Sequence, residues 1–518
     1  MSTAEQHIRI THADGRAVHR KLALLTVAVA QLMVVLDATI VNVALGDIFT
    51  SLEVSSQADL SWIVTAYTLT FGGFLLLGGK IADRLGRREI FIAGAVLFAV
   101  ASLAGGLASN LGLLIAARAV QGIGGALMSP AALSLLTVIF KEGQERNRAL
   151  GVWAGITAGG AALGLILGGI LTEYASWRWV FLVNIPIAAI AVVGALRFIP
   201  KSRDERAQKF DVPGAVLVTV GLMSLVYALV KGNDNGWGST ETVGTLLLSA
   251  VLLLGFVLVQ RRADVPLVPF HIFRNRSVLG ADIGALFVGA GIFAIFFFLI
   301  LWMQQVNGKT PANPDGWTPI TSGLAFLPMT VLIGTAAGIG SKLLGKIGAR
   351  PLLVVGPLTS AVGLLQLAFR LEPESTYLGT ILPALGCVAF GMGLTFVSLT
   401  SSAIAGVPHE DAGIASALLN AGQQVGGALG LAILTAVSSS HSSSLFPGIK
   451  QAQGQISGAL SSGNPPEPSL LSKVNDALVS GWAVGFYVGA AFLITAAIVT
   501  ASLVKISKEQ AVAANPLS

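Results

Sequence analysis

GKIADRLGRR, residues 79–88, follows a long apolar stretch, and SKLLGKIGAR, residues 341–350, follows another. The glycines Gly86 and Gly348 are 262 positions apart, and so are the arginines Arg88 and Arg350. A basic loop that recurs at the same place among apolar stretches indicates a chain built from two related halves.

The composition on either side of these loops is that of an integral membrane protein. Of 518 residues, 54% are hydrophobic and 11% are charged, whereas a soluble domain carries about 25% charged residues. A membrane-spanning helix needs about 20 mainly apolar residues. The sequence predicts fourteen such spans: Leu22–Leu45, Leu60–Gly79, Glu89–Ala108, Leu111–Ile139, Ala149–Leu171, Trp179–Ile199, Val212–Val230, Val243–Val259, Val278–Gln305, Pro319–Leu344, Leu352–Arg370, Tyr377–Leu399, Ala412–Val437 and Gly481–Val504.

The distribution of Lys and Arg predicts the orientation of these spans. With the N-terminus inside, 25 of the 32 basic residues lie in or beside cytoplasmic segments, six lie in external segments, and Arg118 lies within a span. This bias follows the positive-inside rule. We therefore expect a multi-pass protein of the cell (inner or plasma) membrane with both termini in the cytoplasm, and we interpret the net charge of +6 as an orientation signal rather than a sign of nucleic-acid binding.

The predicted fold class is all-α, with two six-helix bundles and two inserted central helices. The segment Ser438–Ser480 is rich in Ser, Gly and Pro, which favours a flexible external loop. The predicted organisation is a cytoplasmic tail at 1–21, a first bundle at 22–199, the inserted pair at 211–260, a second bundle at 277–504 that includes the external loop 438–480, and a cytoplasmic tail at 505–518.

Two opposite charges are predicted at matched depth inside the membrane. Asp37 lies eight residues before the external end of its span, and Arg118 lies seven residues after the external start of its own. At 1.5 Å per residue, both side chains are about 10–12 Å below the outer surface. A buried carboxylate marks a proton or substrate path, and contact with Arg118 would lower the cost of burying both charges. A structural hydrogen bond for Asp37 and snorkelling of Arg118 are the alternatives.

The loop at 79–88 is predicted to act as a gate as well as a topology anchor. Its glycines permit close helix approach and a tight turn, and Asp83 is not required by the positive-inside rule. The residues assigned to this gating loop are Gly79, Asp83, Arg84, Gly86, Arg87 and Arg88.

Other spans suggest close packing or a ligand cavity. Small residues at four-residue spacing allow tight helix packing, and span five supplies them as Gly160, Gly164, Gly168 and Gly169. Asp282 lies about 6 Å inside span nine, so interfacial solvation is expected for it. Aromatic rings suit flat amphiphilic ligands, but lipid contact or interhelical hydrogen bonding explains such residues equally well. The predicted substrate cavity comprises Asn42, Tyr67, Phe293, Phe297, Trp302, Asn420 and Gln424.

Several classes of protein are not supported. Cys387 is the sole cysteine, and the six histidines form no HxxxH or HExxH pair, so we expect no disulfide, no metal and no cofactor. No GxxxxGK[ST] sequence is present, so we expect no nucleotide-driven pump on this chain. We expect a protein that is not an enzyme.

The motifs together resemble the major facilitator superfamily, and within it the fourteen-span drug:proton antiporters that include multidrug and antiseptic exporters. The loop at 79–88 is similar to the superfamily's signature loop, and the surroundings of Asp37 are similar to the first-span motif of the subgroup. Residues 118–125 resemble the fourth-span motif, and residues 177–186 resemble the entry to span six. Leu165 and Gly46 stand where the family usually has proline.

This resemblance implies proton-coupled export of small amphiphilic compounds, such as drugs or antibiotics, by alternating access. The alternative is a dedicated exporter of one natural product, lipid or metabolite. A membrane receptor would need a folded soluble domain, and no such segment is seen. The expected partners are a small-molecule substrate, protons and membrane lipid, without nucleic acid or nucleotide, and the expected state is a monomer.

Overall fold

The computed structural model describes most of the chain, and it is helical where spans were predicted. The described residues are 19–54, 56–140, 144–203, 211–308, 313, 316–405, 407–408, 412–461, 466–506 and 510, so most of both predicted tails lies outside them. Over these ranges, thirteen helices are long and apolar enough to cross a membrane. Span five lies within a further helix of 31 residues, Gln144–Tyr174, whose apolar part is Gly159–Tyr174.

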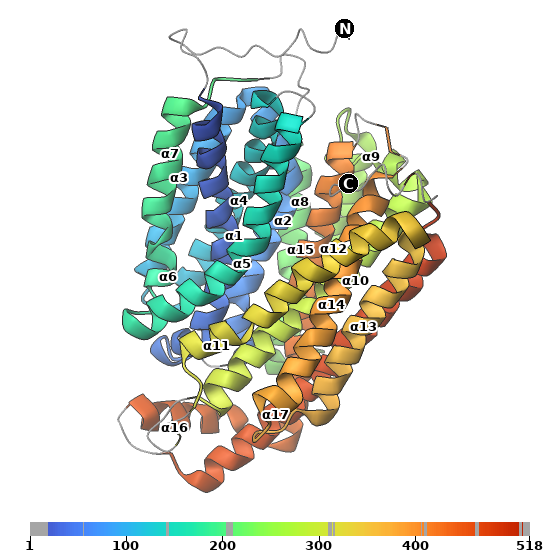
Figure 1. Ribbon diagram of the computed structural model, residues 1–518. Coiled ribbons are helices and arrows are strands. Elements are labelled where there is room, and N and C mark those ends of the chain that lie inside the picture. Colours follow the sequence, from blue (N-terminus) through green and yellow to red (C-terminus); the bar gives the residue numbers. More distant parts are fainter. Residues whose placement is uncertain are drawn as a thin grey trace, which may run out of the picture. The chain divides into compact units, whose positions relative to one another are not determined.

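The described residues form two compact units, and the first holds the predicted N-terminal bundle. It draws on Met1–Val41, Ala66–Met223 and Leu248–Pro269. Figure 1 shows its helices as a bundle of long antiparallel rods. Its helices, some of them shared with the second unit, are α1 (Arg20–Ser51), α2 (Gln57–Leu85), α3 (Arg87–Gly106), α4 (Leu111–Ile139), α5 (Gln144–Tyr174), α6 (Trp179–Leu182), α7 (Asn184–Phe198), α8 (Val212–Asn235) and α9 (Thr240–Arg262).

Predicted span six is divided into α6 and α7 at Val183. Pro186 explains the break, because it has no N–H with which to bond the carbonyl of Leu182, four residues earlier. The break places Asn184 at the first position of α7, fully buried.

The second unit holds the predicted C-terminal bundle. It draws on Asn42–Thr65, Ser224–Leu247 and Phe270–Ser518, so it includes the C-terminal end of α1 and the N-terminal end of α2. Its other elements are η2 (Phe270–Arg274), α10 (Arg276–Leu301), η3 (Trp302–Val306), α11 (Pro319–Ala325), α12 (Leu327–Ile347), α13 (Ala349–Arg370), η4 (Tyr377–Ile381), α14 (Leu382–Ile404), α15 (Ala412–Leu445), α16 (Ile449–Ser461) and α17 (Pro468–Leu503).

The repeated loop is built in the same way in both units. A single glycine, Gly86, separates α2 from α3, and a single glycine, Gly348, separates α12 from α13. Their φ angles are 120° and 82°, values that residues with a Cβ rarely adopt. The internal repeat predicted from the sequence is therefore confirmed as a repeated helix–glycine–helix turn.

The close helix approach beside this loop is made by Gly78 rather than by Gly79. A Cβ at Gly78 would lie 2.1 Å from the backbone oxygen of Ala126 in α4, whereas one at Gly79 would lie 3.5 Å from the Cβ of Pro130. The role expected of Gly79 in close packing thus belongs to its neighbour.

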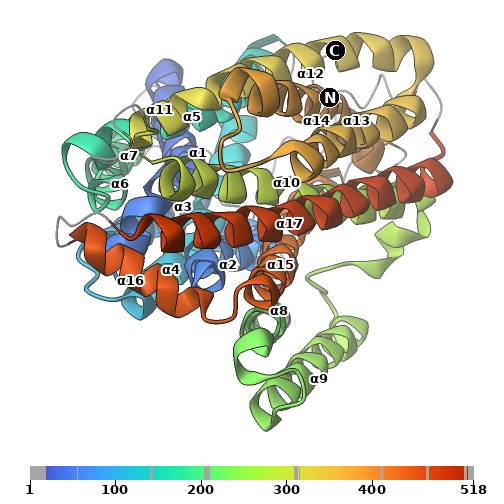
Figure 2. The same cartoon turned by 90° about the horizontal axis from the view of Figure 1, so that it is seen from below.

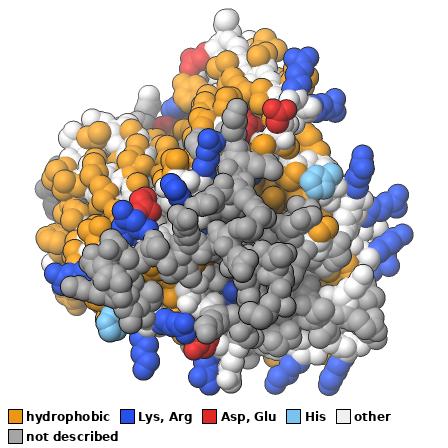
Figure 3. All heavy atoms as spheres, turned by 90° about the horizontal axis from the view of Figure 1, so that it is seen from above, with side chains coloured by type: hydrophobic (Ala, Val, Ile, Leu, Met, Phe, Trp, Pro, Cys, Tyr) orange, Lys and Arg blue, Asp and Glu red, His pale blue; other side chains and the backbone are white. Residues whose placement is uncertain are grey.

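Basic residues gather at the end of the first unit that carries this loop. Arg20 of α1 pairs with Glu145 of α5 at 2.8 Å, and Arg88 of α3 donates to the carbonyl of Ile199 at 3.3 Å. Figure 3 looks onto such helix ends and shows many more Lys and Arg than Asp and Glu side chains. This distribution agrees with the bias read from the sequence.

The prediction of a flexible loop at 438–480 is wrong. Helix α15 continues to Leu445, α16 covers Ile449–Ser461, and α17 begins at Pro468. Figure 2 shows α16 beside the first turns of α17. Composition misled the prediction, because Ser and Gly were counted without the helical spacing of the apolar side chains Ile449 and Ala452, which are buried.

Candidate functional site

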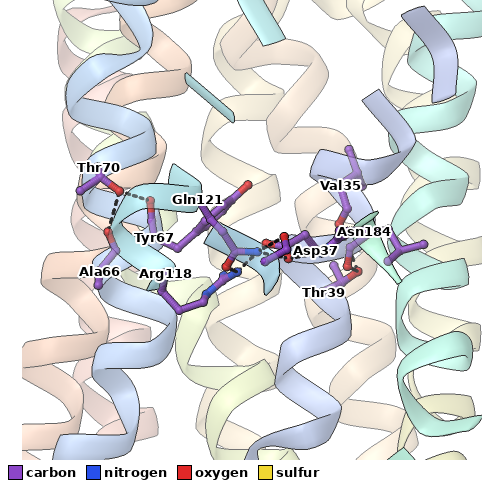
Figure 4. A network of polar contacts seen from close by, with 11 residues as sticks. Val35, Asp37, Thr39, Ala66, Tyr67, Thr70, Arg118, Gln121 and Asn184 are labelled. Carbon is purple, nitrogen blue, oxygen red and sulfur yellow. Dashed lines mark hydrogen bonds and ion pairs between the residues drawn. The ribbon is translucent and has the colours of Figure 1, made fainter. Parts of the chain in front are cut away.

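Asp37 and Arg118 form an ion pair in the interior of the first unit. Arg118 Nη1 lies 2.5 Å from Asp37 Oδ2, and the two side chains are 0% and 1% exposed. The predicted contact between these residues is therefore confirmed. Figure 4 shows the two side chains pointing toward each other from α1 and α4.

Two amide side chains complete the surroundings of the Asp37 carboxylate. Asn184 Nδ2 donates to Oδ1 at 2.9 Å, and Gln121 Nε2 donates to the same oxygen at 3.2 Å. Gln121 also accepts from Arg118 Nη1 at 3.0 Å and donates to Ser102 Oγ at 2.7 Å. We call these five residues the Asp37 cluster. A fully hydrogen-bonded ion pair is the arrangement in which a buried charge is least costly.

Aromatic rings enclose the guanidinium. Its central carbon lies 4.2 Å from the ring centroid of Tyr67 and 5.9 Å from that of Phe181. Tyr67, predicted as a cavity residue, is buried and packs on Arg118 and on the ring of Phe71. The negative face of the ring adds a favourable cation–π contact in a buried region.

Helix α5 packs closely against α1 beside Asp37, and the predicted glycines form this contact. A Cβ at Gly164 would lie 2.0 Å from Oγ1 of Thr39, and one at Gly168 would lie 2.8 Å from the carbonyl oxygen of Ile40. Gly160 faces side chains of α1 in the same way, and Gly169 is buried. These small residues let α5 approach the helix that carries Asp37, although Leu165 stands where a proline was expected.

The loop at 79–88 holds its charges within the first unit. Arg87 Nε donates to Asp83 Oδ1 at 2.8 Å, and Ser134 Oγ donates to the same oxygen at 3.4 Å. The backbone N–H of Arg87 bonds the carbonyl of Ser202 at 2.9 Å, while Arg84 is exposed. Asp83 therefore links α3 and α4 to the end of α2.

The remaining predicted cavity residues differ in their surroundings. Phe297 and Trp302 are 1% exposed and belong to the aromatic core of the second unit, where Trp302 Nε1 donates to the carbonyl of Glu372. Phe293 packs against Gly427. Of the others, Asn42 is buried, Gln424 is half-buried, and Asn420 is exposed.

Asp282 differs from the expectation of interfacial solvation. It lies six residues into α10, about 9 Å from the helix start. Both carboxylate oxygens are shielded from solvent, and no hydrogen-bond partner for either is found among the described residues. Depth alone misled the prediction, because both carboxylate oxygens are shielded although the residue as a whole is half-buried. Among the described residues, no three of His, Cys, Asp and Glu gather as metal ligands would.

Gln304 of η3, the short helix that directly follows α10, bonds to the C-terminal part of α1 within the second unit. Its Nε2 donates to the carbonyl of Val43 at 2.8 Å, and its Oε1 accepts from the N–H of Gly46 at 3.2 Å. A proline at position 46 would have no N–H to donate, which explains physically why glycine suits this chain.

The geometry of a buried, amide-supported ion pair in a bundle of membrane helices is that of a membrane transporter. A model of the Major Facilitator Superfamily matches residues 27–431, and the chain belongs to this superfamily.

Several similar proteins are named as resistance or export proteins. The puromycin resistance protein pur8 of Streptomyces alboniger is 40% identical over 429 residues, 82% of this chain and 83% of the relative. The cephamycin export protein CmcT of Amycolatopsis lactamdurans is 38% identical over 81% of this chain and 85% of its own length. The multidrug resistance protein Stp of Mycobacterium tuberculosis is 35% identical, over 80% and 75% respectively.

Solved structures share the fold at low sequence identity. A bacterial homolog of the human lysosomal transporter Spinster superposes with a TM-score of 0.65 at 18% identity, over 95% of this chain and all of that one. The xylose transporter XylE from E. coli gives 0.59 at 13% identity, over 94% and 97%. The all-α fold of the superfamily, predicted from the sequence, is thereby confirmed.

Sequence reasoning did not assign Gln121, Asn184 and Ser102 to the site. A signal for Gln121 was present, since a residue three positions after Arg118 lies on the same helix face. Asn184 entered the sequence analysis only as part of the motif at 177–186, because span six was predicted as one continuous helix rather than as α6 and α7.

Proposed function

We propose that this chain is a proton-coupled exporter of small lipophilic compounds, with Asp37 as the carboxylate that carries the proton. The Asp37 cluster is the observation on which the proposal rests. A charged pair with supporting amides, all of it buried, is costly to maintain in a membrane and marks a proton path. The names of the relatives support drugs or antibiotics as the substrate class.

The cluster supports a two-state carboxylate. In the arrangement described, the negative charge of Asp37 is balanced by Arg118 and solvated by the amides of Gln121 and Asn184. If the helices move so that Arg118 separates from Asp37, desolvation favours the neutral acid, and Asp37 takes up a proton. When the pair forms again, the proton is released. If Asp37 takes up its proton while it is accessible from one side of the membrane and releases it while it is accessible from the other, proton entry would be coupled to export.

Contacts at the outer ends of α1 and α2 would have to release during such a cycle. Gln304 holds α1, while Gln57 of α2 bonds Gln305 at 3.1 Å and accepts from Trp482 Nε1 at 2.8 Å. These are neutral hydrogen bonds, each contributing about 0.5–1.5 kcal/mol. Such contacts suit a closure that opens and re-forms repeatedly.

The loop at 79–88 is proposed as the cytoplasmic gate. The Asp83–Arg87 pair is partly exposed, so it contributes little to stability and can exchange partners. Gly86 keeps the turn between α2 and α3 to one residue. We further propose a monomer in the cell membrane with both termini in the cytoplasm. Export of one dedicated natural product on the same fold is the alternative, which the name of the cephamycin export protein favours.

Replacement of Asp37 by Asn tests the proposal. Asp37→Asn keeps the shape of the side chain but cannot take up a proton, so substrate uptake driven by an imposed proton gradient in inverted vesicles should fall to the level seen with a protonophore. Binding of the same substrate to purified protein should persist. The compounds to be assayed are cationic, neutral and anionic lipophiles, because the geometry of the site does not define the charge of the substrate.

Asp476→Asn supplies the matched control, since Asp476 is exposed near the start of α17. Gradient-driven uptake by Asp37→Asn at the wild-type rate would place proton coupling elsewhere. Uptake that depends on ATP and is insensitive to the protonophore would overturn the proposed mechanism altogether.

A further inference from the structure

Asp282 lies in the other unit, and its carboxylate has surroundings opposite to those of Asp37. The oxygens of Asp37 receive hydrogen bonds from Arg118, Gln121 and Asn184. Those of Asp282 are also shielded from solvent but receive no hydrogen bond from any described residue. Asp37 and Asp282 thus differ: an arginine balances the charge of Asp37, whereas no described residue pairs with Asp282.

The backbones of α10 and α15 approach closely at Asp282. A Cβ at Gly422 would lie 3.4 Å from the carbonyl oxygen of Asp282. One and two turns further along, a Cβ at Gly426 would lie 2.0 Å from the carbonyl oxygen of Leu286, and one at Gly430 would lie 2.3 Å from Cα of Ala290. These glycines present backbone rather than long side chains to α10, so the two helices pack closely beside Asp282.

The helices packed against α10 bring no charge to the middle of this packing. Helix α14 contains no Lys, Arg, Asp or Glu, and α15 contains no ionisable residue except His441 near its far end. Helix α17 carries Lys473 and Asp476 in its first turns, and Lys505 follows its end. The remaining charges are those of α10 and η2 themselves, His271, Arg274 and Arg276, and none of the residues named here forms an ion pair with Asp282 in the described part of the chain.

An unbalanced carboxylate in such surroundings has two stable forms. Burial of an ionised carboxylate without a partner is unfavourable, so the side chain holds a proton or receives a cation. The Asp37 carboxylate is already fully engaged, so a cationic ligand gains more from Asp282.

We propose that Asp282 is the site that receives the cationic group of a lipophilic, singly charged substrate in exchange for a proton. The exchange is balanced: the neutral acid and a permanent cation give a carboxylate–cation pair and one proton released to water. A neutral substrate displaces no proton here. This assignment deepens the proposed function by naming a substrate class, and it rests on that function only for the claim that the bound cation is afterwards exported.

Equilibrium binding of tetraphenylphosphonium to the purified, full-length protein tests the proposal without transport. This ion is permanently cationic and has no proton of its own. We expect wild type to bind it with release of one proton, measured in a weakly buffered solution, and to bind it more weakly as the pH falls. Asp282→Asn should bind it about tenfold or more weakly, as expected when a charge-assisted contact is lost, and without proton release.

Two controls separate this inference from others. Asp476→Asn removes an exposed carboxylate of the same unit and should bind like wild type with the same proton release. Asp37→Asn should also retain cation binding and proton release while losing gradient-driven export, so failure of the proposed function and failure of this inference give different results.

The thermal unfolding temperature of Asp282→Asn distinguishes a ligand site from a structural residue. Because no described residue donates a hydrogen bond to either oxygen, the amide should unfold at or above the wild-type temperature. Unchanged cation affinity and proton release in Asp282→Asn, or no binding of tetraphenylphosphonium to wild type, would overturn the proposal.

Discussion

At the scale of single residues, the geometry of the guanidinium of Arg118 is as important as its charge. One nitrogen donates to Asp37 and to Gln121, and the planar group lies over the ring of Tyr67. A lysine at this position would keep the charge, but its single ammonium on a flexible stem could not reproduce the stacked, planar contact.

We therefore predict that Arg118→Lys reduces the initial rate of gradient-driven export by about tenfold or more, normalised to the amount of protein in the membrane. Arg118→Leu should be worse, because an unpaired buried Asp37 lowers the free energy of unfolding by about 3–5 kcal/mol. Arg178→Lys is the matched control, since Arg178 bonds carbonyls at the end of α3 and lies outside the Asp37 cluster. If Arg118→Lys exported at the wild-type rate, Arg118 would be needed only to balance the charge of Asp37.

The site was predictable from the sequence only where charge was involved. Asp37 and Arg118 stood out because charges within spans are rare, and their matched depth predicted the contact. Amides such as Gln121 and Asn184 are common in helix interfaces, so their role required knowledge of which helix faces meet. Asp282 was misjudged because the sequence gives the depth of a residue but not the cover supplied by neighbouring helices.

At the scale of elements, the helices were predictable and their ends and breaks were less so. Hydropathy located the spans, but the division of span six at Val183 and the helix α16 depend on local spacing rather than on average composition. Gly46, where the family usually has proline, is also explained at this scale. The side-chain amide of Gln304 donates one hydrogen bond to the backbone of α1 and accepts another from it.

This contact between η3 and α1 yields a double-mutant prediction. A Cβ at Gly46 would lie 2.3 Å from Gln304 Oε1 and 3.1 Å from its Cβ, so Gly46→Ala should displace the amide and cost about 1–3 kcal/mol. Gln304→Ala loses the same two hydrogen bonds. The double variant should therefore be no less stable than Gln304→Ala alone, as measured by thermal unfolding in detergent. Gly334→Ala, where a Cβ meets nothing within 4 Å, is the control. Additive losses would show that the two residues act independently.

At the scale of the whole molecule, the two units share a repeated turn but carry different charges. The first has Asp83 beside its positive-φ glycine, while the second has Gly345 at the corresponding position. The first holds a balanced buried ion pair, and the second holds an unbalanced carboxylate. We therefore propose a division of labour, in which the first unit handles the proton through Asp37 and the second unit selects substrate charge through Asp282.

The orientation of the whole chain in the membrane is open to a direct test with single cysteines in a Cys387→Ser background. Gly238, between α8 and α9, and Gln455, on α16, are exposed and are predicted to lie outside the cell, whereas exposed Arg203 is predicted to lie inside. A membrane-impermeant maleimide should label Gly238→Cys and Gln455→Cys in intact cells, and Arg203→Cys only after permeabilisation. Helix α16 has 13 residues and is about 20 Å long, too short for a bilayer core of about 30 Å, so Gln455 should share the side reached by α15 and α17. Protection of Gly238→Cys in intact cells would mean that α8 and α9 do not cross the membrane, and the chain would then have twelve spans rather than fourteen.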